Sequence, residues 1–375
     1  MLMASVTRAA GLSAALLTLL SACSASSADD GVDTGTAVAA AGAATGRPVP
    51  RPLTPHPNEP RLQNVTQLTD GGENAEAYFS RDGSQLIFQS TRDGRSCDQQ
   101  FVINVDGTGL RRVSTGEGKT TCGYFYADDS RILFASTHAE QQSCPARPDP
   151  SQGYVWGLDP FDIYTSRPDG SDLQRLTSYG VYTAEGTIAP DGETMVFTSL
   201  KDGDLDIYTM KMDGTEVRRL TTTPGYDGGP FYSPDGSKIV YRAWHPPDSA
   251  GLADYQGLLA QRMVRPSRME LWVMDADGGN QRQITDLGGA NFAPFFTPDG
   301  QGIIFSSNHK NPRSRNFDLY LVSLDGTGLE QITFDEEFDG FPMFSPDGTK
   351  LVWASNRGAT NPGETNLMIA EWSSR

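Results

Sequence analysis

Six segments of the chain place a basic or imidazole residue four positions after an aromatic residue that ends a short apolar run. These residues are Arg92, His138, Lys201, His245, His309 and Arg357. Neutral imidazole nitrogens are ligands for zinc and manganese, so His138, His245 and His309 are candidate ligands of a divalent metal. The same set could instead bind an anion, or each member could pair with an acidic group in its own segment.

Carboxylates and other polar residues precede the same apolar runs. Six positions before the Ser of a recurring Ser-Pro-Asp-Gly segment, or its equivalent, stand Asn74, Thr121, Thr183, Asp227, Asn291 and Asp339. Asn, Asp and Thr side chains cap local turns, which accounts for most of this set. Glu76 and Glu185, two positions further on, are harder to explain in this way, because other segments have Gly, Ala or Phe there. All of these residues are candidate ligand-binding residues at the rim of a channel.

The elements that must position these residues are repeats. Each repeat begins with two apolar runs joined by Asp-Gly, and the second run ends on the aromatic residue. The Asp-Gly pairs begin at Asp82, Asp191, Asp235, Asp299 and Asp347, and a degenerate sixth copy has Asp129-Ser130. Asp-Gly between two apolar runs predicts a β-hairpin, because Gly tolerates the positive φ that tight hairpin turns need.

A third and a fourth run follow most hairpins, so each repeat holds four strands. The repeats recur at intervals of roughly 45 to 65 residues, which is typical of a β-propeller with variable loops. The sixth repeat lacks its fourth strand, and the unpaired run from Asn64 to Thr69 matches it. We therefore predict an all-β, six-bladed β-propeller of four-stranded antiparallel blades. The N-terminal strand closes the ring and removes an exposed sheet edge.

Composition excludes one class of function. The formal net charge of the 375-residue chain is −17, which opposes nucleic-acid binding, because such binding depends on Lys and Arg neutralising phosphates. Acidity also suits an extracytoplasmic protein. One ring-shaped domain accounts for most of the length, and we expect a monomer.

The N-terminal residues have the pattern of an exported lipoprotein. Arg8 precedes an apolar run from Leu12 to Leu20 that is too short to span a bilayer and is typical of a secretory signal. The small residues before Cys23 resemble the site at which bacterial lipoproteins are cleaved and lipidated. An ordinary signal peptide cleaved near Ala22 is the alternative. Ser24, rather than Asp, after this cysteine resembles the sorting pattern of enterobacterial lipoproteins, which implies the outer membrane, on its periplasmic side or at the cell surface.

These features divide the chain into three parts. We predict a lipoprotein signal peptide over residues 1–22, and a lipidated Cys23 that begins a disordered tether over residues 23–63, which is rich in Ala, Gly, Ser and Pro. The propeller follows over residues 64–375. The lipid would be the protein's attachment to the membrane.

Three further cysteines lie in the predicted propeller. Cys97 and Cys144 fall between the second and third strands of neighbouring blades, and Cys122 lies near the start of an inner strand. Export favours disulfide formation. We expect one disulfide among these three residues, and the sequence does not select the pair.

Long insertions should concentrate on one face of the ring. They fall between second and third strands, at residues 139–160 and 246–269, whereas the opposite face carries short Asp-Gly turns. We call these the loop-rich face and the turn face. Binding residues gather in loops on rigid scaffolds, so we expect ligand binding on the loop-rich face. Apolar residues at helical spacing predict a short helix within 249–264, capped by Asp248 or Ser249.

The repeats resemble the TolB-type propeller family. The motifs that carry the resemblance are the Ser/Thr/Ala-Pro-Asp-Gly turns, Asp-Ile-Tyr at 162–164 and 206–208, and the Leu-Thr or Ile-Thr ends of the fourth strands. The resemblance spans Asn64 to Trp372. It implies a six-bladed propeller that binds protein within an envelope complex. Periplasmic members carry an additional N-terminal α/β domain, where this chain has the tether.

Two functions are consistent with these residues. The first, which we favour, is a non-enzymatic cell-envelope propeller without a cofactor that binds an envelope protein, or an anionic saccharide or peptide, on its loop-rich face. The alternative is a metal-dependent, lyase-like enzyme acting on acidic polysaccharide, since related propellers include such lyases. A histidine would then act as base while Arg or Lys neutralises the sugar carboxylate. The chain has no Gly-x-Ser-x-Gly elbow and no Gly-rich phosphate loop, and no catalytic residue is assigned.

Overall fold

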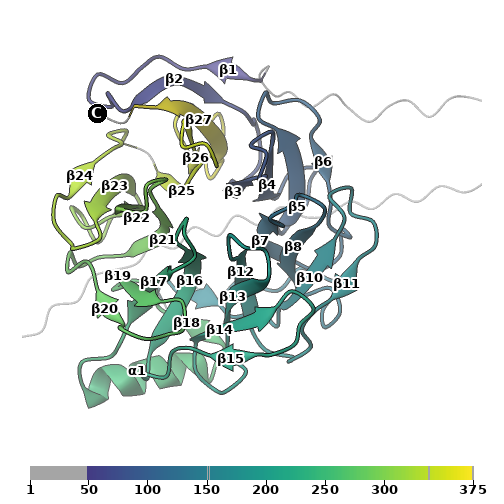
Figure 1. Ribbon diagram of the computed structural model, residues 1–375, viewed down its shortest axis with the longest axis vertical. Coiled ribbons are helices and arrows are strands. Elements are labelled where there is room, and N and C mark those ends of the chain that lie inside the picture. The colour runs from purple at the N-terminus through teal and green to yellow at the C-terminus, as the bar shows by residue number, and fades with distance from the viewer. Residues whose placement is uncertain (1–48, 150, 152, 337, 374–375) are drawn as a thin grey trace, which may run out of the picture. The chain divides into compact units, whose positions relative to one another are not determined.

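The computed structural model describes residues 49–149, 151, 153–336 and 338–373, and these form a ring of six antiparallel sheets around a central channel (Figure 1). Each sheet is a blade whose first strand lies nearest the channel and whose last strand lies at the outside. The predicted all-β, six-bladed propeller is confirmed. The expected signal peptide, Cys23 and most of the expected tether lie outside the described residues.

The strands follow one another regularly from blade to blade. The first three blades are β3 (Asn74–Phe79), β4 (Gln85–Ser90), β5 (Gln99–Asn104) and β6 (Arg111–Arg112); β7 (Thr120–Phe125), β8 (Ile132–Ser136), β10 (Asp162–Ser166) and β11 (Gln174–Arg175); and β12 (Thr183–Ile188), β13 (Thr194–Ser199), β14 (Asp206–Lys211) and β15 (Arg218–Arg219). The last three are β16 (Tyr226–Tyr232), β17 (Lys238–Trp244), β19 (Glu270–Asp275) and β20 (Arg282–Gln283); β21 (Asn291–Phe296), β22 (Gly302–Ser307), β23 (Asp318–Ser323) and β24 (Glu330–Gln331); and β25 (Asp339–Phe344), β26 (Lys350–Ser355) and β27 (Asn366–Trp372).

Turn chemistry and aromatic packing shape each blade. In the fourth blade the Asp235 carboxylate accepts hydrogen bonds from the Ser233 hydroxyl at 2.6 Å and from Ser237 N at 3.0 Å, and Gly236 has a φ of +73°. The aromatic residue near the end of each second strand is fully buried, which applies to Phe88, Phe134, Phe197, Tyr241, Phe305 and Trp353. Burial of these rings is a large part of the core that stabilises the ring.

The N-terminal segment closes the ring. Strand β2 (Leu62–Gln67) pairs antiparallel with β27, and β1 (Arg51–Pro52) pairs with β2 as a fifth strand. The predicted closure near Asn64–Thr69 is confirmed, although the strand begins two residues earlier. The expected tether was too long at its C-terminal end, because Arg51, Pro52, Leu62 and Gln63 pair in the outer strands of the sixth sheet.

A buried ion cluster fixes this segment to the ring. Glu59, which is 2% exposed, accepts hydrogen bonds from the Arg357 guanidinium at 2.9 and 3.1 Å. The same guanidinium donates to the Asp339 carboxylate at 2.7 Å, and Trp353 Nε1 donates to Asp339 at 2.9 Å. Arg357 therefore joins a residue that precedes the first blade to the inner strand of the last blade.

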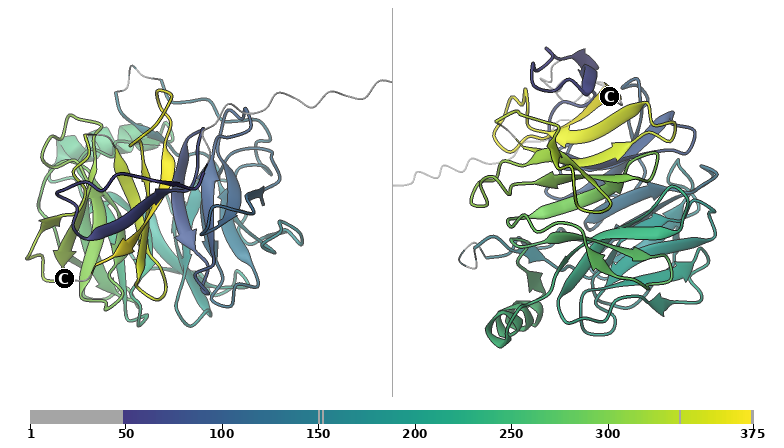
Figure 2. Two further views of the ribbon diagram at one scale, coloured as in Figure 1. Left: turned by 90° about the horizontal axis from the view of Figure 1, so that it is seen from above. Right: turned by 60° about the vertical axis from the view of Figure 1, so that its left-hand side comes forward.

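Two long insertions meet through a short sheet. The insertion of the fourth blade forms helix α1 (Ser249–Leu259), with Asp248 as its N-cap as predicted, at the periphery of the ring (Figure 1, Figure 2). After the helix, β18 (Met263–Val264) pairs with β9 (Trp156–Gly157) from the insertion of the second blade. In the described part of the chain, no helix has the length and apolar character of a membrane span.

Removing the Arg357 guanidinium should destabilise the ring strongly. In Arg357→Met the carboxylates of Glu59 and Asp339 stay buried without a counter-ion, and such a loss costs about 3–5 kcal/mol. Arg92→Met is the matched control, because Arg92 holds the same repeat position but donates to neutral groups. Chemical denaturation should show a clearly larger loss for Arg357→Met, and equal losses would show that the cluster does not secure the closure.

Candidate binding site at the mouth of the channel

Each inner strand carries a β-bulge, at its third residue in five blades and at its fourth residue, Gly229, in β16. The strand register shifts there in all six blades, and the bulged residue has a φ between 51° and 60°. These residues are Glu76, Cys122, Glu185, Gly229, Ala293 and Phe341. Positive φ is uncommon for residues other than Gly, and bulges re-aim side chains beside functional sites. All six residues line one recess in the channel, on the side of the loop-rich face.

An aromatic layer forms the floor of this recess. The recess has a volume of about 30 Å³, and Tyr78 and Phe231 lie among its lining residues. Their ring centroids are 5.6 Å apart, and Phe231 lies 5.4 Å from Phe295 and 6.4 Å from Tyr124. Phe295 and Tyr124 line a second cavity on the side of the turn face. The aromatic layer therefore separates two cavities within one channel.

A buried ion pair forms one wall of the recess. The Arg242 guanidinium binds the Glu185 carboxylate and donates to the Tyr226 hydroxyl at 2.7 Å. Glu185 also accepts a hydrogen bond from Gly229 N at 2.8 Å. A Cβ atom on Gly229 would lie 2.0 Å from Arg242 Nη1. The bulged position therefore needs glycine for the Arg242 side chain to pass it and reach Glu185. Trp156, from the insertion of the second blade, stacks on the guanidinium at 5.4 Å.

Two buried side-chain atoms of the recess lack a hydrogen-bond partner among the described residues: Arg242 Nε and one carboxyl oxygen of Glu76, Oε2. Burial raises the pKa of Glu76 to about 7, against an opposing hydrogen bond from Cys122 and with a further rise from the Glu185 charge. Burial also raises the pKa of the Cys122 thiol, which therefore stays protonated. The recess thus contains one ion pair and one carboxyl group that titrates near neutrality.

Ionisation of Glu76 should cost stability as the pH rises. Its pKa is about 7 in the folded protein against an ordinary value of 4.5, so folding favours the neutral acid. This advantage is complete below pH 4.5 and is lost as the pH rises through 7. Glu76→Gln cannot ionise, and its melting temperature should therefore rise relative to wild type between about pH 5 and pH 8.

Asp235→Asn is the control for this experiment. Hydrogen bonds from Ser233 and Ser237 lower the pKa of Asp235 to about 2. Asp235 is therefore ionised throughout the same pH range, and its contribution to folding stability does not change there. The difference in melting temperature between Asp235→Asn and wild type should therefore stay constant. An equally constant difference for Glu76→Gln would contradict a neutral Glu76 in the folded protein.

The polar set at the start of the inner strands lies inside the blades rather than on the channel rim. Asn74, Thr183, Asp227, Asn291 and Asp339 are each at most 1% exposed. In the first blade Ser90 Oγ donates to Asn74 Oδ1 at 2.8 Å, and Asn74 Nδ2 donates to Thr365 O at 2.7 Å. These side chains therefore tie the strands of each blade together, and Asn74 and Asn291 also bond to the preceding blade in the ring. The expected rim position was wrong.

In the second blade the corresponding residue is Thr120 rather than Thr121. Thr120 begins its strand opposite the end of the second strand, as Asn74 does in the first blade. Asp128 fills the place of the turn aspartate, and Asp129, with a φ of +57°, fills that of the glycine. The degenerate turn had hidden this one-residue shift in the alignment of the repeats.

The basic and imidazole residues also make their contacts within their own blades. Each member packs over an aromatic ring of its own blade, which applies to Arg92, His138, Lys201, His245, His309 and Arg357. The Nδ1 atoms of His138 and His309 lie 2.7 and 2.9 Å from the hydroxyl of the serine two residues earlier. His245 Nε2 lies 3.0 Å from Asp227 Oδ1. The structure thus separates these residues instead of gathering them in the channel.

The three histidines do not fit a shared metal site. They belong to different blades, and each has a ring nitrogen engaged within its own blade. Among the residues that the structure describes, no group of three or more His, Cys, Asp or Glu side chains is placed to hold a metal ion. The arrangement therefore offers no basis for deriving metal-assisted chemistry from this set.

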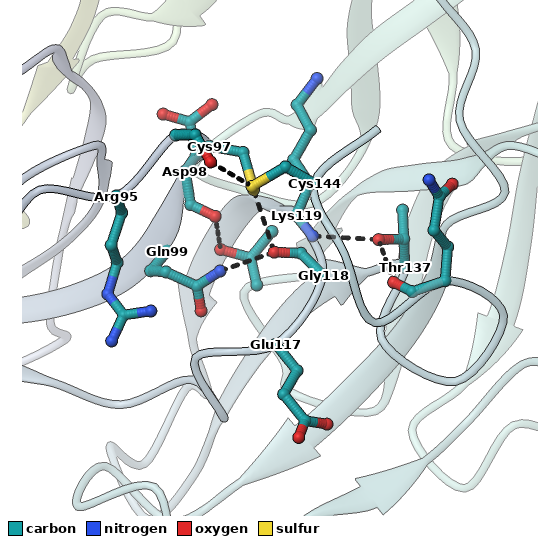
Figure 3. Close-up of a disulfide and its surroundings, with 12 residues drawn as sticks. Arg95, Cys97, Asp98, Gln99, Glu117, Gly118, Lys119, Thr137 and Cys144 are labelled. Atoms are coloured by element: carbon teal, nitrogen blue, oxygen red, sulfur yellow. Dashed lines mark hydrogen bonds between the residues drawn. A yellow bond between two sulfur atoms is a disulfide. The ribbon is translucent and has the colours of Figure 1, made fainter. Parts of the chain in front are cut away.

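A disulfide joins loops of the first two blades. It links Cys97 to Cys144 and leaves Cys122 as a free thiol. Figure 3 shows the bridge beside Gly118, whose carbonyl oxygen accepts a hydrogen bond from Gln99 Nε2 at 2.8 Å. The two cysteines are 47 residues apart in sequence. The bridge holds the long insertion of the second blade against the first blade and restricts the freedom of both loops.

The sequence analysis missed Arg242, which lines the recess, and Trp156, which stacks on it. Arg242 stands in a second strand at a position where the other blades have Gln, Ala, Thr or Ser. This departure from the repeat is visible in the sequence and could have marked Arg242 as a site residue. Trp156 belongs to an insertion without a counterpart in the repeat, so only the tertiary structure brings it to the recess.

Comparison with known proteins places this geometry in a family. A sequence profile of the TolB beta propeller domain (PD40) matches residues 159–248 and 259–362, which together make up just over half of the chain. The chain belongs to the TolB beta propeller domain family. No curated protein sequence matches it.

Solved structures of TolB proteins share the fold. A TolB from Agrobacterium tumefaciens is 19% identical with a TM-score of 0.54, over 80% of this chain and 91% of that one. TolB from Acinetobacter baumannii is 17% identical with a TM-score of 0.52, over 81% of this chain and 64% of that one. An oligogalacturonate lyase from Vibrio parahaemolyticus is 14% identical with a TM-score of 0.48, over 83% of this chain and 94% of that one. Identities this low show the fold alone, and the lyase is too distant to support an argument.

Proposed function

We propose that this TolB-family propeller is a non-enzymatic, monomeric protein of the cell envelope that docks a partner protein on its loop-rich face. The observation that carries the proposal is the buried, unpartnered carboxylate oxygen of Glu76 in a recess at the mouth of the channel. A buried acceptor without a donor costs free energy. A partner that supplies the donor would recover this cost on binding.

The two walls of the recess differ in chemistry, which supports a protein partner. Glu76 and Glu185 come from the first and third blades, whereas Phe341 comes from the sixth blade. The Phe341 ring lies 5.6 Å from Phe292 and 6.1 Å from Phe338. Aromatic residues and a few desolvated charges dominate the energetics of protein interfaces. A partner's lysine or arginine would place its aliphatic stem along Phe341 and its cation beside Glu76.

A protein is better supported than the anionic ligand that the basic residues had suggested. The basic side chains bind groups of their own blades, as Arg92 does with Ser90, Lys201 with Asp202 and Arg357 with Asp339. Arg242 in the recess already pairs with Glu185. The carboxylates of Glu76 and Glu185 would repel an anion. The three histidines lie in separate blades and, among the described residues, do not form a shared metal site, so we do not propose lyase activity.

Photo-crosslinking in cells tests the docking face. A photoreactive residue in place of Phe338, which is partly exposed beside the recess, should form adducts with an envelope protein. The same residue in place of Glu193, which is exposed on the turn face, should form none. Adding Glu76→Lys to the Phe338 probe should reduce the adduct yield about tenfold or more, because it replaces the carboxylate with a charge that repels the expected cation.

Glu117→Lys is the matched control for the charge change. Glu117 is exposed in a loop of the same face but does not line the recess, so its replacement should leave the adduct yield nearly unchanged. Equal yields from the Phe338 and Glu193 probes would show that the loop-rich face is not the docking face. If Glu117→Lys and Glu76→Lys reduced the adduct yield equally, the recess would not be part of the docking site.

We also propose that the protein is exported and held at the outer membrane by a lipid on Cys23. The apolar run from Leu12 to Leu20 and the small residues before Cys23 support this. Cys23→Ser should move the protein from the membrane fraction to the soluble fraction. Ser24→Asp keeps the lipid and should change only the membrane in which the protein resides. Unchanged membrane binding of Cys23→Ser would refute the anchor.

A further inference from the structure

The larger cavity of the channel lies on the turn face, away from the proposed docking site. Its volume is about 160 Å³. Its apolar lining includes Phe79, Phe125, Phe295, Phe296 and Phe344. Its rim includes Pro190, Pro234, Pro298 and Pro346 of the Ser/Thr/Ala-Pro-Asp-Gly turns. A protein cavity of about 150 Å³ holds a benzene ring. This cavity is therefore large enough for one aromatic ring with a short substituent.

Arg81 interrupts the proline rim. It occupies the position where four other blades have Pro and the second blade has Ala127. Arg81 is the one charged residue among those that line the cavity. Among the described residues, no carboxylate forms an ion pair with its guanidinium; the neighbouring Asp129 carboxylate accepts hydrogen bonds from the backbone nitrogens of Arg81 and Asp82 at 2.6 and 2.9 Å. The cavity therefore has an apolar interior and one cation at its rim that lacks an anionic partner.

Tyr124 gives the cavity a second polar group. Burial raises the pKa of Tyr124 to about 12, while the charge of Arg81 opposes this rise. The Tyr124 hydroxyl therefore keeps its proton at neutral pH and can donate a hydrogen bond. It lies close enough to Arg81 for the charge of Arg81 to lower its pKa. The hydroxyls of Ser233 and Ser345, by contrast, already donate to the aspartates of their own turns at 2.6 Å. The turn aspartates are not among the residues that line the cavity.

We propose that this cavity binds a small aromatic monocarboxylate. The ring of the ligand would pack against Phe295 and the wall of the cavity, and its carboxylate would accept hydrogen bonds from the Arg81 guanidinium and the Tyr124 hydroxyl. Small-molecule sites are mostly apolar cavities with a few polar groups that fix orientation, and an arginine recognises a carboxylate through two parallel donors. The Arg81 charge disfavours a cationic ligand, and a neutral aromatic molecule would leave the guanidinium without a partner. This site is independent of the docking proposed for the loop-rich face.

Titration calorimetry with 3-phenylpropionate tests the proposal. The full propeller should bind this acid with a Kd of about 1 mM or lower. The neutral analogue 3-phenylpropan-1-ol should bind about tenfold more weakly or worse, because it offers no charge to Arg81. Binding of 2-phenylethylamine should be weaker still. Absence of acid binding up to about 10 mM, or equal affinity for the acid and the alcohol, would overturn the proposal.

Variants assign the binding to this cavity. Arg81→Ala introduces the residue that the second blade has at this position, and it should weaken acid binding about tenfold or more. Arg81→Gln, which keeps most of the side-chain length, should weaken it similarly, and Tyr124→Phe should weaken it severalfold. Arg167→Ala is the control, since Arg167 is exposed beside another turn of the same face but does not line the cavity. Unchanged affinity in both Arg81 variants, or an equal loss in Arg167→Ala, would refute the assignment.

Discussion

Closure of the ring is the constraint on which the rest of this structure depends. The first and last blades are far apart in sequence, and two contacts join them: β2, which precedes the first blade, pairs with β27 of the sixth sheet, and β3 packs against β25 and β26. Backbone hydrogen bonds complete the sheet, and Arg357 adds a buried cluster with Glu59 and Asp339. Both cavities of the channel are lined by residues from the first and the sixth blades, so neither would keep its shape if this joint opened.

The bulge in each inner strand converts a repeating scaffold into a site. Six equivalent bulges each turn one residue toward the channel, and the chemistry of the recess follows from the residue that each blade places there. Glu76, Glu185 and Gly229 differ most in what they do: one carboxylate stays unpaired, one binds Arg242, and the glycine leaves room for that arginine. Equivalent backbones with unlike side chains make a symmetric fold into an asymmetric binding surface, which is why a shared propeller fold does not determine function.

The aromatic layer divides the channel into two ends of different chemistry. Tyr78 and Phe231 face the acidic recess, whereas Tyr124 and Phe295 face the apolar cavity, and the rings pack against one another between them. A ligand at one end therefore does not reach the other end without moving this layer. The loop-rich face has charged groups and aromatic walls suited to a protein partner, and the turn face has a small apolar pocket with one cation.

The sequence by itself determined the elements and their number, because Asp-Gly turns, alternating apolar runs and buried aromatics act over a few residues. It also located the closing strand near Asn64 and marked Glu76 and Glu185 as unusual. Only the tertiary structure decided what these residues meet. It buried Asp339 and Arg357 with Glu59, separated the three histidines and brought Trp156 over Arg242. Those contacts join residues far apart in sequence, and their geometry depends on ring curvature and on the bulges, which local patterns do not encode.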